Sequence, residues 1–160
     1  MKNVVLTRID DRLLHGQVVV SWIPFVNANE VIVLDEDNAK DEFMKELILL
    51  SSPHDVKTHV FTNEEAVEYL KGPSNGEKII ILVKEISNIK NLLDNNINVG
   101  TINLGGLGFN NNRKRFLNFI SLSNEEVELL KELENTYNYN LEVQMIPSEK
   151  KYDLEELLKV

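Results

Sequence analysis

Cysteine is absent from the chain, which excludes disulfide bonds and thiolate chemistry and fits a protein of the reducing cytoplasm. Long apolar runs are absent too. None approaches the roughly 18 residues of a membrane span, and no basic stretch followed by an apolar segment marks a secretory signal. Basic residues are in deficit, with 17 Lys and Arg against 26 Asp and Glu and a formal net charge of −9. Proteins that bind nucleic acid through its phosphates usually carry the opposite balance, so we expect no nucleic-acid partner.

The size and composition of the chain predict one globular domain. Its 160 residues are enough for one core and too few for two ordinary domains. Hydrophobic residues make up 42% and charged residues 27%, as in ordinary soluble domains. No internal repeat, low-complexity block or Pro/Gly/Ser-rich linker divides the sequence. We therefore expect a single domain over residues 1–160.

Short apolar, β-branched runs alternate with helical patterns along the chain, and such runs are typical of strands covered on both faces. The expected strands are residues 4–6, 31–34, 57–61, 79–83, 99–104 and 141–145. The expected helices are residues 38–50, 87–93, a helix that begins at Thr62 or Asn63 and ends before Gly72, and a helix from the capping box of Ser123 and Glu126 to Leu133. This order predicts an α/β fold with an open, mainly parallel sheet and helices on both faces.

The segment from Gln17 to Ile23 gives two opposite signals. Its three consecutive valines and its tryptophan favour a strand by intrinsic propensity. The alternation of strands and helices, and the length from His15 to Pro24, favour a helix instead. We expect the helix.

The most densely charged segment, residues 8–18, directly follows the first apolar run. If the helix begins near His15, this segment lies at the carboxyl end of the first strand, where open α/β sheets bind ligands. The first turn of a helix offers unpaired N–H groups and the positive end of the helix dipole, which attract an anion. Gly16 lets the backbone approach that anion, and Arg8 and Arg12 can donate charge-assisted hydrogen bonds to it. A neutral imidazole is a competent nucleophile toward phosphorus, so His15 is the candidate phosphoryl acceptor.

Asp10 and Asp11 belong to the same segment, and we expect them to orient His15 or Arg12. A carboxylate too close to a phosphoryl group would repel it, so neither is expected to contact the phosphate. The alternative is that both aspartates cap a helix while the arginines are solvated. The His15-Gly16-Gln17 sequence that follows favours the chemical interpretation.

The remaining candidates are weaker. His54 and His59 have no carboxylate at a metal-ligand spacing, so we expect surface or strand-edge histidines and no metal site. Residues 105–108 follow a strand and contain three glycines, but they do not match the G-x-G-x-x-G pattern, and no cofactor is expected. This loop would instead pack beside the His15 loop. Trp22 is expected in the core.

Residues 8–18 closely resemble the active-site signature of the mannose/sorbose-family IIB components of the bacterial phosphoenolpyruvate-dependent sugar phosphotransferase system. Trp22 falls where this family usually has a tryptophan. Asn103-Leu104-Gly105-Gly106-Leu107, followed by Phe109, looks like the family's Asn-x-Gly-Gly-Met-x-Phe loop, with leucine in place of the common methionine. The length also matches one IIB domain, so the resemblance covers essentially the whole chain.

The resemblance implies a phosphotransferase in which His15 takes a phosphoryl group from a phosphohistidine on a separate IIA protein. His15 would use Nδ1 and the donor Nε2. The group would then pass to a sugar bound by the IIC and IID membrane proteins, which would hold the protein at the cytoplasmic face of the membrane. The implied fold is a mainly parallel sheet of about seven strands with the first helix after His15. Gly16 and Gln17 would bind phosphate through the backbone, and Asn103, Gly105 and Gly106 would form a supporting loop.

Two other functions are alternatives to this one. A non-catalytic regulatory or anion-binding module would use the same loop reversibly, without a covalent adduct. A phosphohistidine phosphatase is disfavoured because Leu14 stands where such enzymes place an arginine and no second catalytic histidine is evident. The basic cluster of residues 113–115 either meets an acidic IIA rim or is plain solvated surface. The sugar and the oligomeric state, including a homo-oligomer, stay open.

Overall fold

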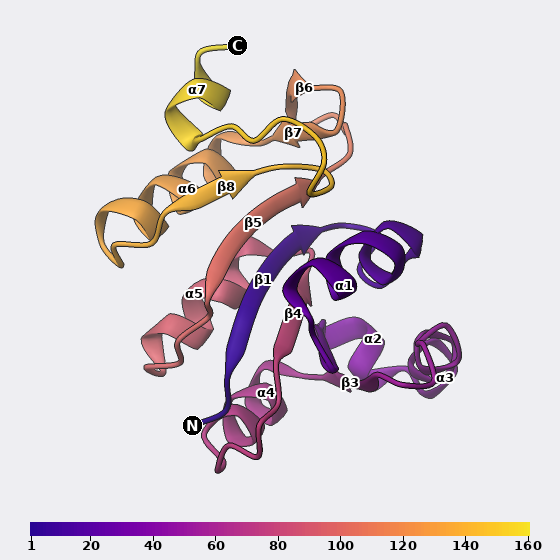
Figure 1. Ribbon diagram of the computed structural model, residues 1–160. Helices are drawn as coiled ribbons and strands as arrows, with labels where there is room; N and C mark the ends of the chain where they lie inside the picture. The colour runs from indigo at the N-terminus through magenta and orange to yellow at the C-terminus, as the bar shows by residue number, and fades with distance from the viewer.

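The computed structural model describes residues 1–160, and a parallel sheet of six strands forms its centre (Figure 1). The strands are β1 (Val4–Asp10), β2 (Glu30–Leu34), β3 (Lys57–Phe61), β4 (Ile79–Val83), β5 (Thr101–Gly106) and β8 (Leu141–Val143). Their order is β3-β2-β4-β1-β5-β8, so β1 lies between β4 and β5. Every residue of β2 and β4 is buried, as their continuous apolar runs predict.

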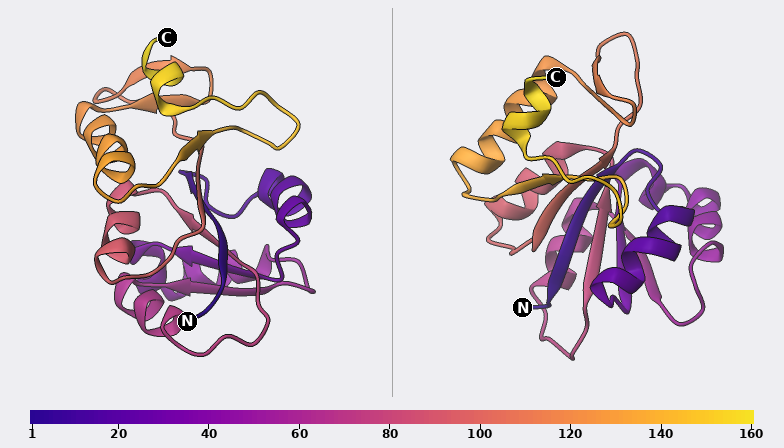
Figure 2. Two further views of the ribbon diagram at one scale, coloured as in Figure 1. Left: turned by 60° about the vertical axis from the view of Figure 1, so that its left-hand side comes forward. Right: turned by 45° about the horizontal axis from the view of Figure 1, so that its top comes forward.

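Two further strands, β6 (Lys114–Leu117) and β7 (Ile120–Leu122), form a separate antiparallel pair. Figure 2 shows this pair standing beyond the end of the main sheet at which β1 and β5 finish. The expected open, mainly parallel α/β sheet is confirmed. The resemblance implied about seven strands in one sheet, whereas the structure has six in the sheet and two outside it.

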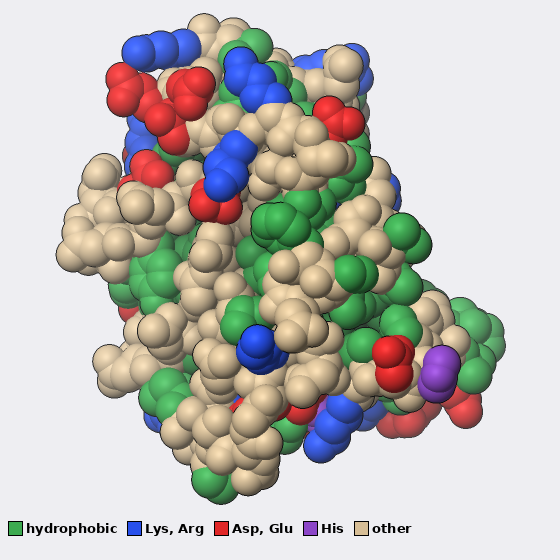
Figure 3. Space-filling model, viewed as in Figure 1, with side chains coloured by type: hydrophobic (Ala, Val, Ile, Leu, Met, Phe, Trp, Pro, Cys, Tyr) green, Lys and Arg blue, Asp and Glu red, His purple; other side chains and the backbone are tan.

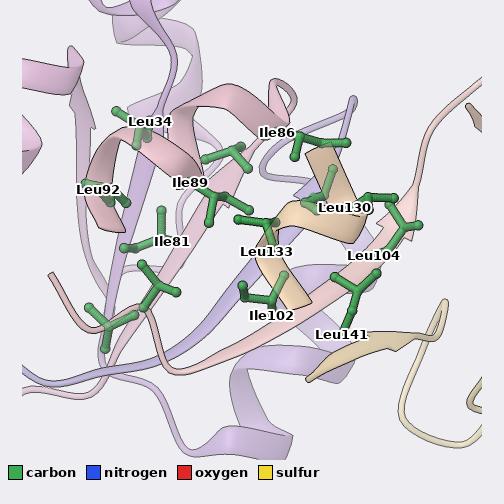
Figure 4. Packing of buried hydrophobic residues seen from close by; sticks show 14 of the residues in the cluster. Leu34, Ile81, Ile86, Ile89, Leu92, Ile102, Leu104, Leu130, Leu133 and Leu141 are labelled. Carbon is green, nitrogen blue, oxygen red and sulfur yellow. The ribbon is translucent and has the colours of Figure 1, made fainter. Parts of the chain in front are cut away.

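Helices cover both faces of the sheet. On one face α4 (Asn63–Leu70), α5 (Ile86–Asp94), α6 (Asn124–Asn135) and α7 (Leu154–Leu158) enclose a core of 25 buried residues. Figure 4 shows Ile89 of α5 and Leu133 of α6 among the strand residues of this core. The other face carries η1 (Val18–Trp22), α1 (Ile23–Val26), α2 (Glu36–Lys40) and α3 (Glu42–Leu50) over a cluster of 12 buried residues. None of the helices has the length and apolar character needed to cross a membrane.

The helix expected over residues 38–50 is two helices in the structure. Asp41 separates them, because its backbone is extended and its carboxylate accepts hydrogen bonds from the N–H groups of Phe43 and Met44 at the start of α3. Ser123 forms the predicted capping box with Glu126, and Thr62, one of the two predicted N-cap residues, forms a capping box with Glu65. Apart from the half-buried Ile48, the apolar residues of α3 are exposed, with Phe43 at 70% and Leu50 at 77%. Figure 3 shows hydrophobic side chains gathered at this outer edge of the molecule.

The segment with conflicting signals is helical. The helix begins at Gly16 and continues to Val26, with a π-helical stretch from Val18 to Trp22. Val18 and Trp22 are buried against the sheet. Tertiary packing thus overrides the strand propensity of the valines. A π-helical stretch of this kind often occurs near functional sites.

Candidate functional site

The His15 loop connects the carboxyl end of β1 to the helix that begins at Gly16. Leu13 shapes this loop: its φ of 56° lies in the left-handed region, its N–H donates to the carbonyl of Asp10, and its side chain is buried under η1. Leu13, with the half-buried Leu14 beside it, therefore anchors a loop whose other residues are polar. His15 is the last residue before the helix, and its carbonyl accepts hydrogen bonds from the N–H groups of Val18 and Val19.

Asp10 is the centre of the site, and its side chain is fully buried. Its Oδ2 accepts hydrogen bonds from Arg8 Nη2 at 3.0 Å and from Arg12 Nη2 at 3.2 Å, and it lies 3.0 Å from His15 Nε2. Its Oδ1 accepts from the backbone N–H of Arg12 at 3.0 Å and from Arg12 Nε at 3.2 Å. Burial raises the pKa of Asp10, but the hydrogen bonds from Arg12 and the charge of Arg8 outweigh it and leave the pKa below its usual value. Asp10 is therefore an ionised carboxylate at neutral pH.

The ionised Asp10 determines which nitrogen of His15 carries the proton. Because Asp10 Oδ2 only accepts, Nε2 of the neutral ring is the donor and Nδ1 carries the lone pair. Nδ1 accepts a hydrogen bond from the N–H of Gln17 at 3.3 Å. Burial lowers the pKa of His15, and the hydrogen bond that Nε2 donates to Asp10 raises it only enough to offset part of that shift. The ring is therefore neutral at pH 7, with Nδ1 as its nucleophilic atom, directed at the start of the helix.

The two arginines of the site lie in different surroundings. The Arg12 side chain is 49% exposed and also donates to Gln17 Oε1 at 2.8 Å, so it remains within reach of an anion on His15. Arg8 is fully buried, donates to Asn103 Oδ1 at 2.7 Å, and lies 5.2 Å from the centroid of the Trp22 ring. The sequence predicts that Arg8 contacts the phosphoryl group, but in the structure it faces Asp10 from the protein interior.

The glycine loop lies beside the His15 loop because β5 pairs with β1. A Cβ atom on Gly105 would lie 2.0 Å from the guanidinium carbon of Arg8, so Gly105 makes the space in which Arg8 is buried. A Cβ atom on Gly106 would lie 3.4 Å from the Asp10 carboxylate, an ordinary contact, and one on Gly16 would meet no atom within 4 Å. Gly16 therefore faces open space beside His15, where an anion has room to bind.

Two residues that sequence reasoning missed complete the surroundings of Arg8. The carbonyl of Gln144 accepts hydrogen bonds from Arg8 Nη1 at 3.3 Å and from Asn103 Nδ2 at 3.2 Å. The carbonyl of Met145 accepts from Trp22 Nε1 at 3.0 Å. These contacts use backbone carbonyls that lie 136 residues from Arg8, 41 from Asn103 and 123 from Trp22, so no sequence pattern near Gln144 or Met145 predicts them.

Asp11 does not contact His15. Its Oδ2 accepts a hydrogen bond from the N–H of Gly108 at 2.8 Å. Arg113 from the basic cluster donates from Nε and Nη2 to both carboxylate oxygens of Glu126, each at 2.9 Å, and from Nη1 to the carbonyl of Gly108. Asp11 and Arg113 thus tie the loop after β5 to the His15 loop and to α6.

The other two histidines lie at the opposite, amino-terminal edge of the sheet. His59 Nε2 lies 3.2 Å from Glu30 Oε2, and its ring stacks on Phe61 at 4.8 Å between centroids. His54 is exposed. Together with Glu30 and Lys2 it lines a hollow of about 480 Å³. The structure places neither histidine near His15.

Comparison with known proteins places this geometry in a family. The family described as "PTS system sorbose subfamily IIB component" matches residues 4–160. The chain belongs to this family of IIB components. It is 31% identical over 160 residues to the "PTS system fructose-specific EIIB component" of Bacillus subtilis (strain 168), covering 99% of this chain and 98% of that protein. The crystal structure of manxB from Thermoanaerobacter tengcongensis superposes with a TM-score of 0.91 at 35% identity, covering 99% of this chain and 96% of that one.

A third relative has a different organisation. The "PTS system mannose-specific EIIAB component" of Escherichia coli (strain K12) is 28% identical over 154 residues, which cover 96% of this IIB component but only 47% of that protein. The IIB component described here therefore spans about half the length of that relative. Membership in this family gives the chain a role in the phosphotransferase system, and the His15 site is the part of the structure to consider for that role.

Proposed function

We propose that this IIB component, as a single domain over residues 1–160, carries a phosphoryl group on His15 Nδ1. It takes the group from a phosphohistidine on a IIA protein and passes it to a sugar held by the IIC and IID membrane proteins at the cytoplasmic face of the membrane. The observation that carries the proposal is the 3.0 Å contact between His15 Nε2 and the buried Asp10 carboxylate. This contact leaves Nδ1 free of a proton and directed at the start of a helix.

The transfer is a displacement at phosphorus between two imidazole nitrogens. The lone pair of His15 Nδ1 forms the new N–P bond while the N–P bond of the donor breaks, and the leaving nitrogen of the donor keeps that bonding pair. The Nε2 proton of His15 stays in place. The positive charge that develops on the phosphorylated ring therefore faces the ionised carboxylate of Asp10.

The negative charge of the phosphoryl oxygens needs donors on the other side of the ring. The N–H groups of Gly16 and Gln17 at the helix start supply two, together with the positive end of the helix dipole. The exposed Arg12 guanidinium supplies further N–H donors to the phosphoryl oxygens when it turns away from Gln17 Oε1. Arg8 acts through Asp10, since its buried guanidinium holds that carboxylate in its charged form.

The first experiment measures the intact mass of the protein after incubation with phosphoenolpyruvate, the general phosphotransferase proteins and a IIA protein of the same family. We expect one acid-labile phosphoryl adduct on the wild type and none on His15→Ala. The matched control is His54→Ala, the same substitution at an exposed histidine on the opposite edge, which keeps the adduct. An adduct that persists in His15→Ala overturns the assignment. Binding of the IIA protein or of phosphate without any adduct on the wild type favours the non-catalytic anion-binding module.

A further inference from the structure

The loop after β5 is fixed beside the His15 loop. The N–H of Gly108 donates to Asp11 Oδ2 at 2.8 Å, and the carbonyl of Gly108 accepts from Arg113 Nη1 at 2.9 Å. Arg113 is held in turn by its two hydrogen bonds to Glu126 on α6. Both the N–H and the carbonyl of Gly108 are therefore held by hydrogen bonds, and the residue that follows has a defined position next to the site.

That residue, Phe109, is 60% exposed. The guanidinium carbon of Arg115 lies 5.7 Å from the centroid of the Phe109 ring, within the range of a cation–π contact. Lys114, next to Arg115 on β6, is exposed as well. Within the basic cluster, Arg113 is therefore structural and Arg115 faces Phe109, whereas Lys114 lies 5.2 Å from the centroid of the Phe116 ring, on the other face of β6. An exposed aromatic ring beside an arginine has the composition of an interface centre rather than of ordinary surface.

The position of Phe109 places it under any protein that reaches His15. Two histidines that exchange a phosphoryl group must face each other across one phosphorus atom, so the donor surface has to close over His15. A specific interface covers roughly 800 Å² on each partner. Asp11 adjoins Asp10, which contacts His15, and Gly108 contacts Asp11. Phe109, one residue beyond Gly108, therefore lies within this footprint.

The charge of the surface indicates which of the two partners it fits. The chain as a whole carries a net charge of −9, yet two exposed arginines lie here, Arg12 beside His15 and Arg115 beside Phe109. A phosphorylated donor arrives with roughly 1.5 to 2 negative charges on its histidine, whereas the sugar acceptor brings none. Transfer moves this negative charge onto His15, where it reduces the positive potential of the surface and favours release of the spent donor.

We propose that Arg12, Phe109 and Arg115 form a docking surface for the phosphorylated donor protein. The proposal rests on the proposed transfer to His15, and it adds that Phe109 enters an apolar pocket of the donor while Arg115 meets acidic groups around that pocket. The surface binds the phosphorylated donor more tightly than the unphosphorylated one.

The test measures binding in a His15→Ala background, in which the donor keeps its phosphoryl group. The dissociation constant is determined for a family IIA protein in its phosphorylated and unphosphorylated forms. We expect Phe109→Ala and Arg115→Glu each to weaken binding of the phosphorylated form by about tenfold or more. The matched control is Lys71→Glu, the same charge reversal at an exposed residue after α4 on the far edge, with an expected change within about twofold. Arg115→Lys, which keeps the charge, is expected to recover part of the loss.

Three results would overturn the docking surface. The first is a donor affinity unchanged by Phe109→Ala and Arg115→Glu, or changed no more than by Lys71→Glu. The second is equal affinity for the two forms of the donor. The third concerns the surface variants that still contain His15. If they bind the donor as tightly as the parent protein but transfer the phosphoryl group slowly to the membrane-bound sugar, the surface belongs to the acceptor. Weaker donor binding by the surface variants, with no phosphoryl adduct on the wild type, would overturn the proposed transfer and leave the docking surface standing.

Discussion

Asp10 accepts hydrogen bonds from Arg8, Arg12 and His15 at once, and this sharing makes it more than a cap for the following turn. The buried ion pair of Asp10 and Arg8 is stable only while both partners are present, because either one alone would be a buried charge without compensation. The burial of Arg8 lowers the pKa of its guanidinium, and the charge of Asp10 opposes that shift. The side chain that orients the nucleophile thus also keeps Arg8 charged in the interior.

Replacing Asp10 by Asn tests this arrangement. The amide keeps the shape of the side chain but not its charge, so Arg8 is left buried without a counter-ion. We expect Asp10→Asn to lower the free energy of unfolding by about 3 to 5 kcal/mol and to slow phosphoryl acceptance by about tenfold or more. Urea unfolding and the rate of adduct formation measure the two effects.

Asp11→Asn is the matched control for that variant. The Asp11 side chain is 37% exposed, contacts Gly108 rather than His15, and its hydrogen bond can be kept by the amide oxygen. We expect it to change the stability by less than about 1 kcal/mol. Equal effects of the two substitutions would contradict the central role of Asp10.

Among the elements, β5 matters to the site because it lies directly against β1 and leaves room for Arg8. Gly105→Ala would put a Cβ atom 2.0 to 2.5 Å from three guanidinium atoms that are held by Asp10 and Asn103. We expect this variant to lose about 1 to 3 kcal/mol of stability, the range for overpacked sites, and to accept phosphate slowly because Asp10 shifts with Arg8. Thermal unfolding and adduct formation report both effects. Gly106→Ala, one residue further along, makes only a 3.4 Å contact and is the control; a larger loss from Gly106→Ala would contradict this account.

The strands were predictable from sequence because burial on both faces requires continuous apolar runs, as in residues 79–83. The helix after His15 was predictable from the alternation of strands and helices together with the length from His15 to Pro24, and against the strand propensity of its valines. The break at Asp41 was missed, although an aspartate before Glu42 is a capping signal, because the spacing of Phe43, Leu47 and Leu50 on one side suggested one long helix. The antiparallel pair of β6 and β7 was also missed, since its strands are short and mixed in polarity.

The position of Arg8 shows the same limit within the site. Arginine is rarely buried, so a sequence containing Arg8 and Arg12 suggests two equivalent phosphate ligands. Only the pairing of β1 with β5, which brings Gly105 and Asn103 to Arg8, distinguishes them. Contacts that depend on strand order are set by the fold as a whole and leave no local pattern to find.

The stability of the whole molecule depends on pH through two histidine–carboxylate clusters at opposite ends of the parallel strands. His15 pairs with Asp10, and His59 pairs with Glu30. Burial lowers the pKa of both histidines more than their carboxylates raise it, so the folded protein binds fewer protons than the unfolded chain just below pH 6.5, the ordinary histidine value. Stability is therefore complete above about pH 6.5 and is lost as the pH falls toward the lowered values. The lowered pKa of Asp10 adds a second loss below about pH 4.

Urea unfolding between about pH 7.5 and pH 5.5 measures the histidine contribution, since each histidine changes the free energy of unfolding by at most about 1.4 kcal/mol per pH unit. We expect the wild type to lose stability on acidification. The double substitution of His15→Gln and His59→Gln should flatten this dependence, because glutamine does not titrate, even though it lowers the stability at every pH. A slope unchanged in the double variant would show that the pKa of neither histidine shifts on folding, which contradicts the burial argument. A wild-type stability that rises toward pH 5.5, and a double variant in which that rise is lost, would show that the folded protein holds charged histidines. In that case the neutral Nδ1 nucleophile on which the proposed transfer depends would be ruled out, because a charged imidazole has no lone pair for phosphorus.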